Sequence, residues 1–167
     1  MRETDNRVDR FDAALRSVAQ HLGANIVLQA PFDLTPGQVF LLHLIKKEER
    51  CTVSQLAEKM EVKPSAITVM LDRLENRRYI ERFRDQQDRR VVIVQLTKTG
   101  ADVLQKIWNL RKRVVGYCLQ QLDEEEVTTF IQVFEKLARV AADLDVQEFL
   151  STINEEEKRG NTDGNRT

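Results

Sequence analysis

The segment from Thr52 to Gly100 constrains the fold most, because its apolar pattern changes period in a fixed order. It begins with Thr52-Val-Ser-Gln55, a capping-box pattern that starts a short helix. A tight turn follows, and Pro64 opens a second helix because its fixed φ suits the first helical position. After a stretch rich in arginine, the period falls to two between Val92 and Leu96, as a strand requires. Helix, turn, helix and basic β-hairpin in this order predict a winged helix-turn-helix.

A winged helix-turn-helix places its second helix in the major groove of DNA and its wing on the adjacent backbone or minor groove. From Arg50 to Lys98 the chain carries eleven Lys or Arg against seven Asp or Glu, a balance of +4 within a total of −1, so the remaining residues carry −5. Such separation is typical of a chain in which one region meets a polyanion. An ordinary solvated surface can show the same balance, so the motif order is what favours DNA binding.

Long helices are expected before this segment. Apolar residues three and four positions apart between Val8 and Leu22 predict a helix over about Asp5–Leu28, which Pro31 ends. A second helix opens at Thr35-Pro-Gly-Gln38, where the threonine is the N-cap and the glutamine completes a capping box. The body of this second helix is apolar nearly all round, so it is expected to be buried.

Two further helices are expected after the hairpin. Thr97 caps a long helix that continues to about Leu122, and the acidic run Asp123–Glu126 starts a last helix, because carboxylates suit a helix N-terminus. The predicted fold is therefore mainly α, with about six helices and a β-hairpin wing. The tail from Asn154 has no apolar residue and is expected to be disordered. The expected domains are an N-terminal dimerisation helix at 1–33, the winged helix-turn-helix at 34–100, C-terminal dimerisation helices at 101–152 and a disordered tail at 153–167.

The terminal helices carry more apolar surface than one copy of the winged unit can cover. The economical arrangement interleaves the terminal helices of two chains into a homodimer. Its symmetry places two DNA-reading helices about 34 Å apart, which is one turn of DNA. A monomeric helical bundle packed on the winged unit is the alternative. The dimer is favoured because half-site reading normally needs two copies.

The sequence argues against several other classes of protein. No apolar run approaches the roughly 20 residues of a membrane span, and the N-terminus lacks the apolar core of a signal peptide. Two cysteines, Cys51 and Cys118, suit a reducing cytosol, so a cytoplasmic protein without membrane contact is expected. Neither His21 nor His43 has a partner at ligand spacing, so no metal or other cofactor is expected. An enzyme with catalytic residues is not expected, because phosphate loops, nucleophile elbows and catalytic pairs are all missing from the sequence.

Three sequence blocks resemble the MarR (multiple antibiotic resistance regulator) family of transcription factors. They are Leu34–Leu42, Thr52–Met60, and the stretch from Pro64 through Asp88-Arg-Arg90 to Leu96-Thr-Lys-Thr-Gly100. The resemblance covers about residues 5–150. It implies a homodimer, joined through its terminal helices, that binds a pseudo-palindromic double-stranded operator, usually as a repressor. In many members a small phenolic ligand or an oxidant relieves binding.

Two positions depart from the family pattern. Arg78 stands where the family usually has glycine after its DNA-reading helix, and a left-handed conformation there costs a non-glycine residue roughly 1 kcal/mol. Val69 stands where the family often has arginine in the middle of that helix. A valine suggests apolar contact with a thymine methyl in place of a polar base contact.

Candidate DNA contacts lie on the second helix of the motif and on the wing. Core positions on the helix leave one face outward, where Ser65 and Thr68 can donate to base edges or phosphates. Adjacent arginines at the hairpin tip suit a narrow minor groove, and the resemblance assigns that insertion to Arg90. Asp88 is expected to orient a nearby arginine. The expected DNA-binding residues are Lys63, Ser65, Thr68, Val69, Arg73, Arg84, Asp88, Arg89 and Arg90.

The regulatory signal is harder to assign. In the family, effector pockets form between the dimer helices and the winged unit, and Arg16, His21 and His43 are the polar groups expected near that crevice, with a plain surface role as the alternative. Cys51 is the candidate for a thiol redox sensor, although a small packing role is favoured for both cysteines. A protein-interaction module with weak DNA binding is a further alternative. Arg78 and Val69 support that alternative, and the arginine-rich wing argues against it.

Overall fold

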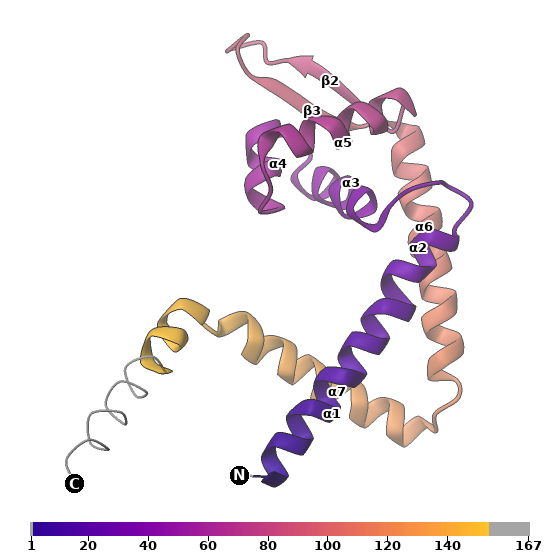
Figure 1. Ribbon diagram of the computed structural model, residues 1–167. Coiled ribbons are helices and arrows are strands. Elements are labelled where there is room, and N and C mark those ends of the chain that lie inside the picture. Colours follow the sequence, from indigo (N-terminus) through magenta and orange to yellow (C-terminus); the bar gives the residue numbers. More distant parts are fainter. Residues whose placement is uncertain (1, 154–167) are drawn as a thin grey trace, which may run out of the picture. The chain divides into compact units, whose positions relative to one another are not determined.

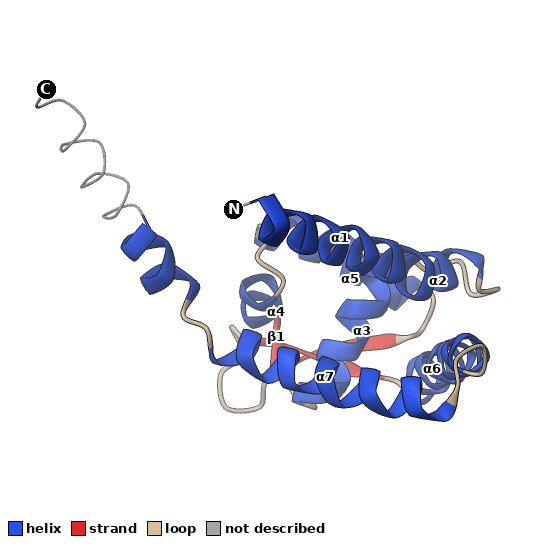
Figure 2. Ribbon diagram, turned by 90° about the horizontal axis from the view of Figure 1, so that it is seen from below, coloured by secondary structure: helices blue, strands red, loops and turns tan. Residues whose placement is uncertain are grey.

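The computed structural model describes residues 2–153, with side chains from Asn6 onward, and confirms a mainly helical chain with a small sheet (Figure 2). The predicted disordered tail at 153–167 lies outside the described residues except for its first position. The elements are α1 (Arg2–Ala19), a π-helix η1 (Gln20–Ala24), α2 (Asn25–Gln29), α3 (Pro36–Glu48), β1 (Cys51–Thr52), α4 (Val53–Lys59), α5 (Pro64–Asn76), β2 (Ile80–Arg84), β3 (Val92–Leu96), α6 (Lys98–Leu119) and α7 (Glu124–Asp143). A further helical stretch covers residues 146–153.

The chain forms two compact units, one up to Cys118 and one from Leu119 onward. In the first unit, Figure 1 shows α3, α4 and α5 gathered against β2 and β3, while α1 and α6 extend away from the sheet. None of the helices within residues 2–153 combines the length and apolar character that crossing a membrane needs.

The predicted helix starts are confirmed by their caps. Thr35 Oγ1 accepts the Gln38 N–H at 3.2 Å, and Gln38 Oε1 accepts the Thr35 N–H at 2.9 Å. Thr52 and its partner three residues later form the same reciprocal box at the start of α4. Each box satisfies two backbone donors that a helix N-terminus otherwise leaves unpaired. These caps therefore set where α3 and α4 begin.

The N-terminal helix is less regular than the predicted continuous helix. Its π-helical turn, η1, ends where the Asn25 N–H bonds to the carbonyl of Gln20. Short π segments of this kind often occur at functional sites. The helix then stops at Gln29, and Ala30 is extended, as the proline that follows it requires.

The sheet has the order β1-β3-β2 and is antiparallel throughout. The hairpin was predicted, but β1 was not. Its two residues pair with Val94 and Ile93, so β3 becomes a central strand. The predicted strand over Val92–Leu96 forms, but burial along it does not alternate, because Ile93 and Val94, which point to opposite faces, are both buried.

The core of the first unit lies between α3, α4, α5, the sheet and the start of α6. The fully buried apolar side chains include Leu41, Leu42, Leu56, Ile67, Leu71, Leu74, Val94 and Leu104. Thr97 caps α6 as predicted, accepting the Gly100 N–H at 3.0 Å. A Cβ on Gly100 would lie 2.0 Å from the Tyr79 carbonyl oxygen, so only glycine fits where α6 crosses the end of the hairpin.

Apolar residues of α1 and α7 stay exposed in the single chain. Val8 and Phe11 on α1 are 62% and 46% exposed, and none of the residues of α7 is buried. Phe130 and Phe134 stack on each other, with ring centroids 5.5 Å apart. Helices with this much uncovered apolar surface normally have a partner.

The long helix α6 ends at Leu119, three residues before the predicted end.

Candidate nucleic-acid interface

Helix α5 has the predicted inward and outward faces. Ile67, Leu71 and Leu74 are fully buried. The opposite face leaves Ser65, Thr68, Val69 and Arg73 exposed. The helix begins at Pro64 with no side-chain cap. Pro64 has no N–H and the Lys63 carbonyl accepts the Ala66 N–H at 2.9 Å, so the Ser65 N–H is the donor left at the start of the helix. That end of α5 is suited to an anion such as a phosphate.

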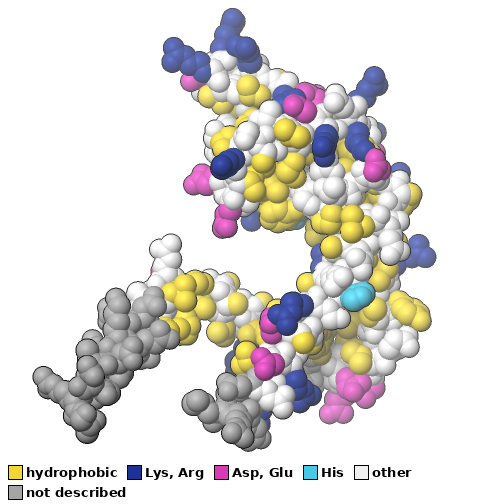
Figure 3. Space-filling model, viewed as in Figure 1, with side chains coloured by type: hydrophobic (Ala, Val, Ile, Leu, Met, Phe, Trp, Pro, Cys, Tyr) yellow, Lys and Arg dark blue, Asp and Glu magenta, His cyan; other side chains and the backbone are white. Residues whose placement is uncertain are grey.

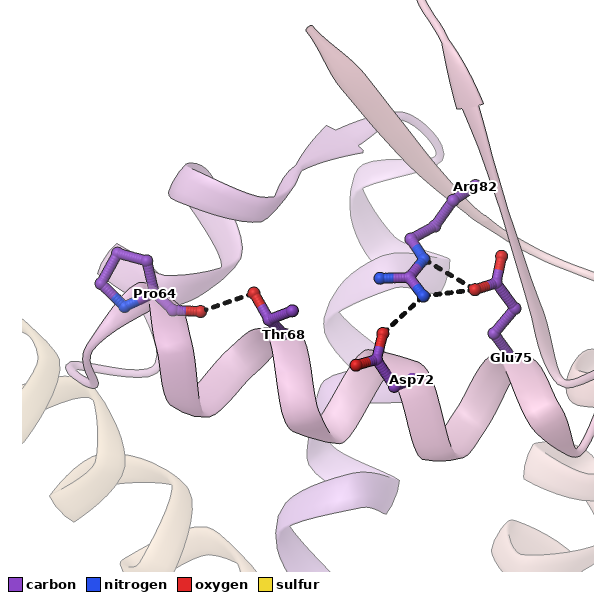
Figure 4. A network of polar contacts seen from close by, with 5 residues as sticks. All are labelled: Pro64, Thr68, Asp72, Glu75 and Arg82. Carbon is purple, nitrogen blue, oxygen red and sulfur yellow. Dashed lines mark hydrogen bonds and ion pairs between the residues drawn. The ribbon is translucent and has the colours of Figure 1, made fainter.

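The Thr68 hydroxyl is already engaged within the helix. It donates to the Pro64 carbonyl at 3.0 Å (Figure 4). While that bond holds, Thr68 offers only acceptor lone pairs outward, so it matches the amino group of adenine or cytosine. The expectation that Thr68 donates to a base or phosphate requires this bond to break.

A three-residue network joins the wing to α5. Arg82 of β2 donates from Nε to Glu75 Oε2 at 2.9 Å and from Nη2 to Asp72 Oδ1 at 2.6 Å, with a further bond from Nη2 to Glu75 (Figure 4). Hydrogen bonding to Glu75, and secondarily to Asp72, raises the pKa of the Arg82 guanidinium above its usual range. One guanidinium thus pairs with two carboxylates of α5 and reduces their combined charge from −2 to −1. This role of Arg82 was not predicted from the sequence, although the i, i+3 spacing of Asp72 and Glu75 places both acids on one helix face.

The wing tip is held by aspartates. Asp85 Oδ1 accepts the N–H groups of Gln87 at 2.7 Å and Asp88 at 3.1 Å. Its other oxygen pairs with Arg50 Nη2 at 3.0 Å. These backbone bonds, with a smaller contribution from the arginine, lower the pKa of the Asp85 carboxyl. The hairpin tip is therefore a folded turn at neutral pH.

The predicted role of Asp88 needs correction. Its carboxylate accepts the backbone N–H of Arg90 at 2.9 Å, so it fixes the turn and does not orient an arginine side chain. The reason is local: an aspartate two residues before an N–H readily closes an Asx turn. Arg84 donates to the Arg89 carbonyl at 3.4 Å. The side chains of Arg89 and Arg90 are exposed and have no ion-pair partner among residues 6–153. Figure 3 shows Lys and Arg side chains, in dark blue, at the wing end of the first unit.

Arg78 adopts the left-handed conformation that the family pattern predicts for this position, with φ of 58°. Its N–H bonds to the Glu75 carbonyl at 2.8 Å, and its own carbonyl accepts the Thr97 hydroxyl at 2.6 Å. The turn is therefore not rebuilt to suit arginine. The backbone strain of roughly 1 kcal/mol is retained.

A cavity of about 260 Å³ lies between α2, α3 and α6 in the same unit. Of the three candidate ligand residues, His43 lines it, His21 lines a separate hollow, and Arg16 pairs with Asp12 on the exposed face of α1. The lining residues are Gly23, Ala24, Ile26, Val27, Pro36, Val39, Phe40, His43, Ile107, Trp108 and Arg111.

An aromatic pair and a cation form the polar side of this cavity. The rings of His43 and Trp108 meet edge to face with centroids 5.4 Å apart, and the Arg111 guanidinium lies 5.8 Å from the Trp108 centroid. Trp108 and Arg111 were not among the candidates from the sequence. The three-residue spacing on α6 places Trp108 about one turn from Arg111, but only the packing of α6 against α3 shows that both line the cavity.

The two cysteines differ in environment. Cys51 is 2% exposed and its thiol donates to the Val94 carbonyl at 3.6 Å. Burial, reinforced by the charge of Glu48, raises the pKa of the Cys51 thiol to about 11. A thiol that stays protonated is a poor nucleophile, so this geometry favours packing over redox sensing. Cys118, predicted to be a packing residue, is exposed in the single chain.

The comparisons with known proteins agree with the geometry. Residues 34–92 match the model of the MarR family. The chain is 39% identical over 142 residues to the HTH-type transcriptional repressor MdtR of Bacillus subtilis, covering 84% of this chain and 92% of that protein. The crystal structure of the YusO protein from Bacillus subtilis has a TM-score of 0.69 at 33% identity, covering 81% of this chain and 96% of that one. Streptococcus pneumoniae FabT, solved in complex with DNA, has a TM-score of 0.65 at 27% identity, covering 84% of this chain and 99% of that one.

Proposed function

Because the chain belongs to the MarR family of transcriptional regulators, with a DNA-binding winged helix, we propose that it acts as a homodimeric repressor of a pseudo-palindromic operator. The observation that carries this proposal is the exposed face of α5 beside a wing whose Arg89 and Arg90 have no internal partner among the described residues. Fully solvated guanidinium groups are the donors that a phosphate backbone or a narrow minor groove attracts.

We assign the DNA contacts by position. Ser65, Thr68 and Val69 face the major groove, where the valine methyls suit a thymine methyl. Lys63 and Arg73 contact phosphates at either end of the exposed face. Arg90 enters the minor groove, with Arg84 and Arg89 on the flanking backbone. Asp88 shapes the turn that presents them.

The exposed apolar residues of α1 and α7 support a dimer formed through the terminal helices. Their exposure in the single chain is far more than a soluble monomer normally shows on two separate helices. The residues proposed for this interface are Val8, Phe11, Leu15 and Val18 on α1 and Phe130, Ile131, Phe134 and Leu137 on α7. The name of the relative MdtR supports repression as the outcome of binding.

We assign the cavity beside Trp108 to the effector. Its walls are mainly apolar, and Arg111 supplies one cation at the rim, so an aromatic carboxylate fits its chemistry. Gly23 offers a direct test, because a Cβ there meets nothing within 4 Å. The bulkier variant Gly23→Leu is expected to fill the cavity and abolish quenching of Trp108 fluorescence by benzoate, while operator binding persists. Equal quenching in both proteins would place the ligand elsewhere.

The decisive experiment measures binding to DNA from the protein's own promoter region by fluorescence anisotropy over a salt series. Wild-type protein is expected to bind tightly and selectively, with an affinity that falls steeply as salt rises. The Arg90→Ala variant is expected to lose at least tenfold in affinity, about 1.4 kcal/mol, with unchanged melting. Lys106→Gln, a charge removed from an exposed position on α6, is the control. Weak binding that ignores sequence and salt would instead favour the protein-interaction alternative.

A further inference from the structure

Arg77 makes a connection outside the DNA-facing residues described above. It is the C-cap residue of α5, and its guanidinium reaches the connection between α2 and α3. Nη1 donates to the carbonyls of Phe32 at 3.0 Å and Asp33 at 2.5 Å, and Nη2 pairs with the Asp33 carboxylate. These bonds span 44 and 45 residues of sequence. A planar guanidinium suits this arrangement because it presents several donors in a fixed fork.

The turn that Arg77 holds is short and constrained. The Phe32 N–H bonds to the Ala30 carbonyl at 2.8 Å, and Asp33 has a left-handed φ of 48°. The flanking residues Ala30 and Leu34 are 6% and 4% exposed, so both ends of the turn are anchored in the core. A displacement of either end therefore reaches the two carbonyls that Arg77 binds.

Both ends of this turn lead into the walls of the cavity. Ile26 and Val27 of α2 precede it, and Pro36 and Val39 of α3 follow it. The α2–α3 connection can be followed in Figure 1. The start of α3 also lies close to α5, since a Cβ added at Gly37 would stand 3.5 Å from the end of the Met70 side chain. The cavity and the DNA-reading helix thus share one short segment of backbone.

We infer that Arg77 is a positioning residue that couples the cavity to the DNA-reading helix, by tying the end of α5 to the turn between α2 and α3. The inference rests on the proposed function, since it concerns how operator binding and cavity occupancy affect each other. Coupling between two sites is reciprocal, so DNA bound at α5 must alter the cavity if a ligand in the cavity alters DNA binding. No ligand is then needed to test the connection.

Trp108 provides the readout, because it is the single tryptophan of the chain and lines the cavity. The experiment titrates full-length protein with promoter DNA and records Trp108 fluorescence together with anisotropy of the labelled DNA. Arg77→Met keeps the apolar stem and removes the donors. Arg77→Lys keeps the charge and removes the fork. Arg78→Gln is the matched control, because it also removes one positive charge. Arg78 lies one position from Arg77, and its side chain has no ion pair within the described chain.

In wild-type protein and in Arg78→Gln, saturating DNA is expected to change Trp108 fluorescence. In Arg77→Met the change is lost at saturation and operator affinity falls about tenfold, equivalent to about 1.4 kcal/mol. Arg77→Lys is expected to resemble Arg77→Met. Circular dichroism at the assay temperature confirms that each variant is folded, and a purely structural role would lower the melting temperature while leaving the fluorescence change at saturation intact.

The outcomes separate the two proposals. If wild-type protein does not bind promoter DNA selectively, the proposed function fails. If it binds but Trp108 fluorescence stays constant, the cavity is not coupled to α5 and the inference alone is overturned. A full fluorescence change in Arg77→Met at saturating DNA overturns it as well.

Discussion

Replacing Arg82 by methionine tests whether the network in Figure 4 prepares α5 for a polyanion. The substitution keeps much of the side chain's apolar stem and removes every donor. Asp72 and Glu75 then lose their common partner. Their side chains are 50% and 38% exposed, so water can solvate the freed carboxylates. The folded state should therefore survive, at a cost of about 1 kcal/mol, near the upper range for exposed ion pairs.

The effect on DNA binding should be larger than the effect on stability. Two unpaired negative charges would remain on the helix that approaches the phosphates. At a separation of about 7 Å in a water-like medium, each charge–phosphate repulsion costs about 0.6 kcal/mol. Because the substitution makes the net charge of this group one unit more negative, from −1 to −2, two phosphates at about that separation cost about 1.2 kcal/mol together, and operator affinity should fall by roughly eightfold. High salt should reduce this difference, because the repulsion is screened.

A rescue experiment separates charge masking from positioning of the wing. The triple variant Arg82→Met, Asp72→Asn, Glu75→Gln removes both carboxylates together with their partner. Its operator affinity, measured by anisotropy, should return to within about threefold of wild type, a residual of about 0.7 kcal/mol. An affinity that stays as low as that of Arg82→Met would refute charge masking. The network would then act by holding the wing against α5.

Three further results are expected. Gly100→Ala should destabilise the fold by about 3 kcal/mol in thermal melts, because its Cβ would overlap the Tyr79 carbonyl; a cost below 1 kcal/mol would mean that α6 shifts freely. Cys118 should react rapidly with a thiol reagent at pH 8, whereas Cys51, whose pKa is raised to about 11, should react only after unfolding; equal rates, or loss of operator binding under peroxide, would restore Cys51 as a sensor. The lowered pKa of Asp85 means that its stabilising bonds are present above the ordinary carboxyl pKa near 4 and are lost as pH falls through the lowered value. Operator affinity should therefore be insensitive to this group from pH 5 to 8, while Asp85→Asn should weaken binding across that range without changing its pH profile.

Local sequence signals predicted the parts of the fold that depend on neighbours in sequence. The capping boxes at Thr35 and Thr52 each need only four consecutive residues, and both form as expected. The outward face of α5 follows from helical period alone. The two-residue strand β1 is too short to show any period, and its pairing with β3 depends on residues about 40 positions away.

Side-chain partners across elements could not be predicted in the same way. The Arg82 network requires β2 to fold back over α5, and the Arg77 bonds require the α2–α3 turn to lie at the end of α5. In the sequence both arginines look like free positive charge. The cavity residues Trp108 and Arg111 raise the same difficulty, since an apolar stripe gives no indication of which members line an opening.

These partners reduce the positive charge that the winged segment presents to DNA. Arg50, Arg77 and Arg82 are each engaged by carboxylates within the unit, so they add little to the field that DNA encounters. Seven basic residues of this segment have no ion pair in the described chain: Lys63, Arg73, Arg78, Arg84, Arg89, Arg90 and Lys98. All of them except Arg78 and Lys98 lie on α5 or its N-cap, or on the wing. The basic residues behind the net charge of +4 therefore fall into two groups: those in internal ion pairs, which fix the geometry, and unpaired cations, which face outward. This separation suits a DNA-binding winged helix, because phosphate attraction depends on unpaired donors held in place and not on total charge.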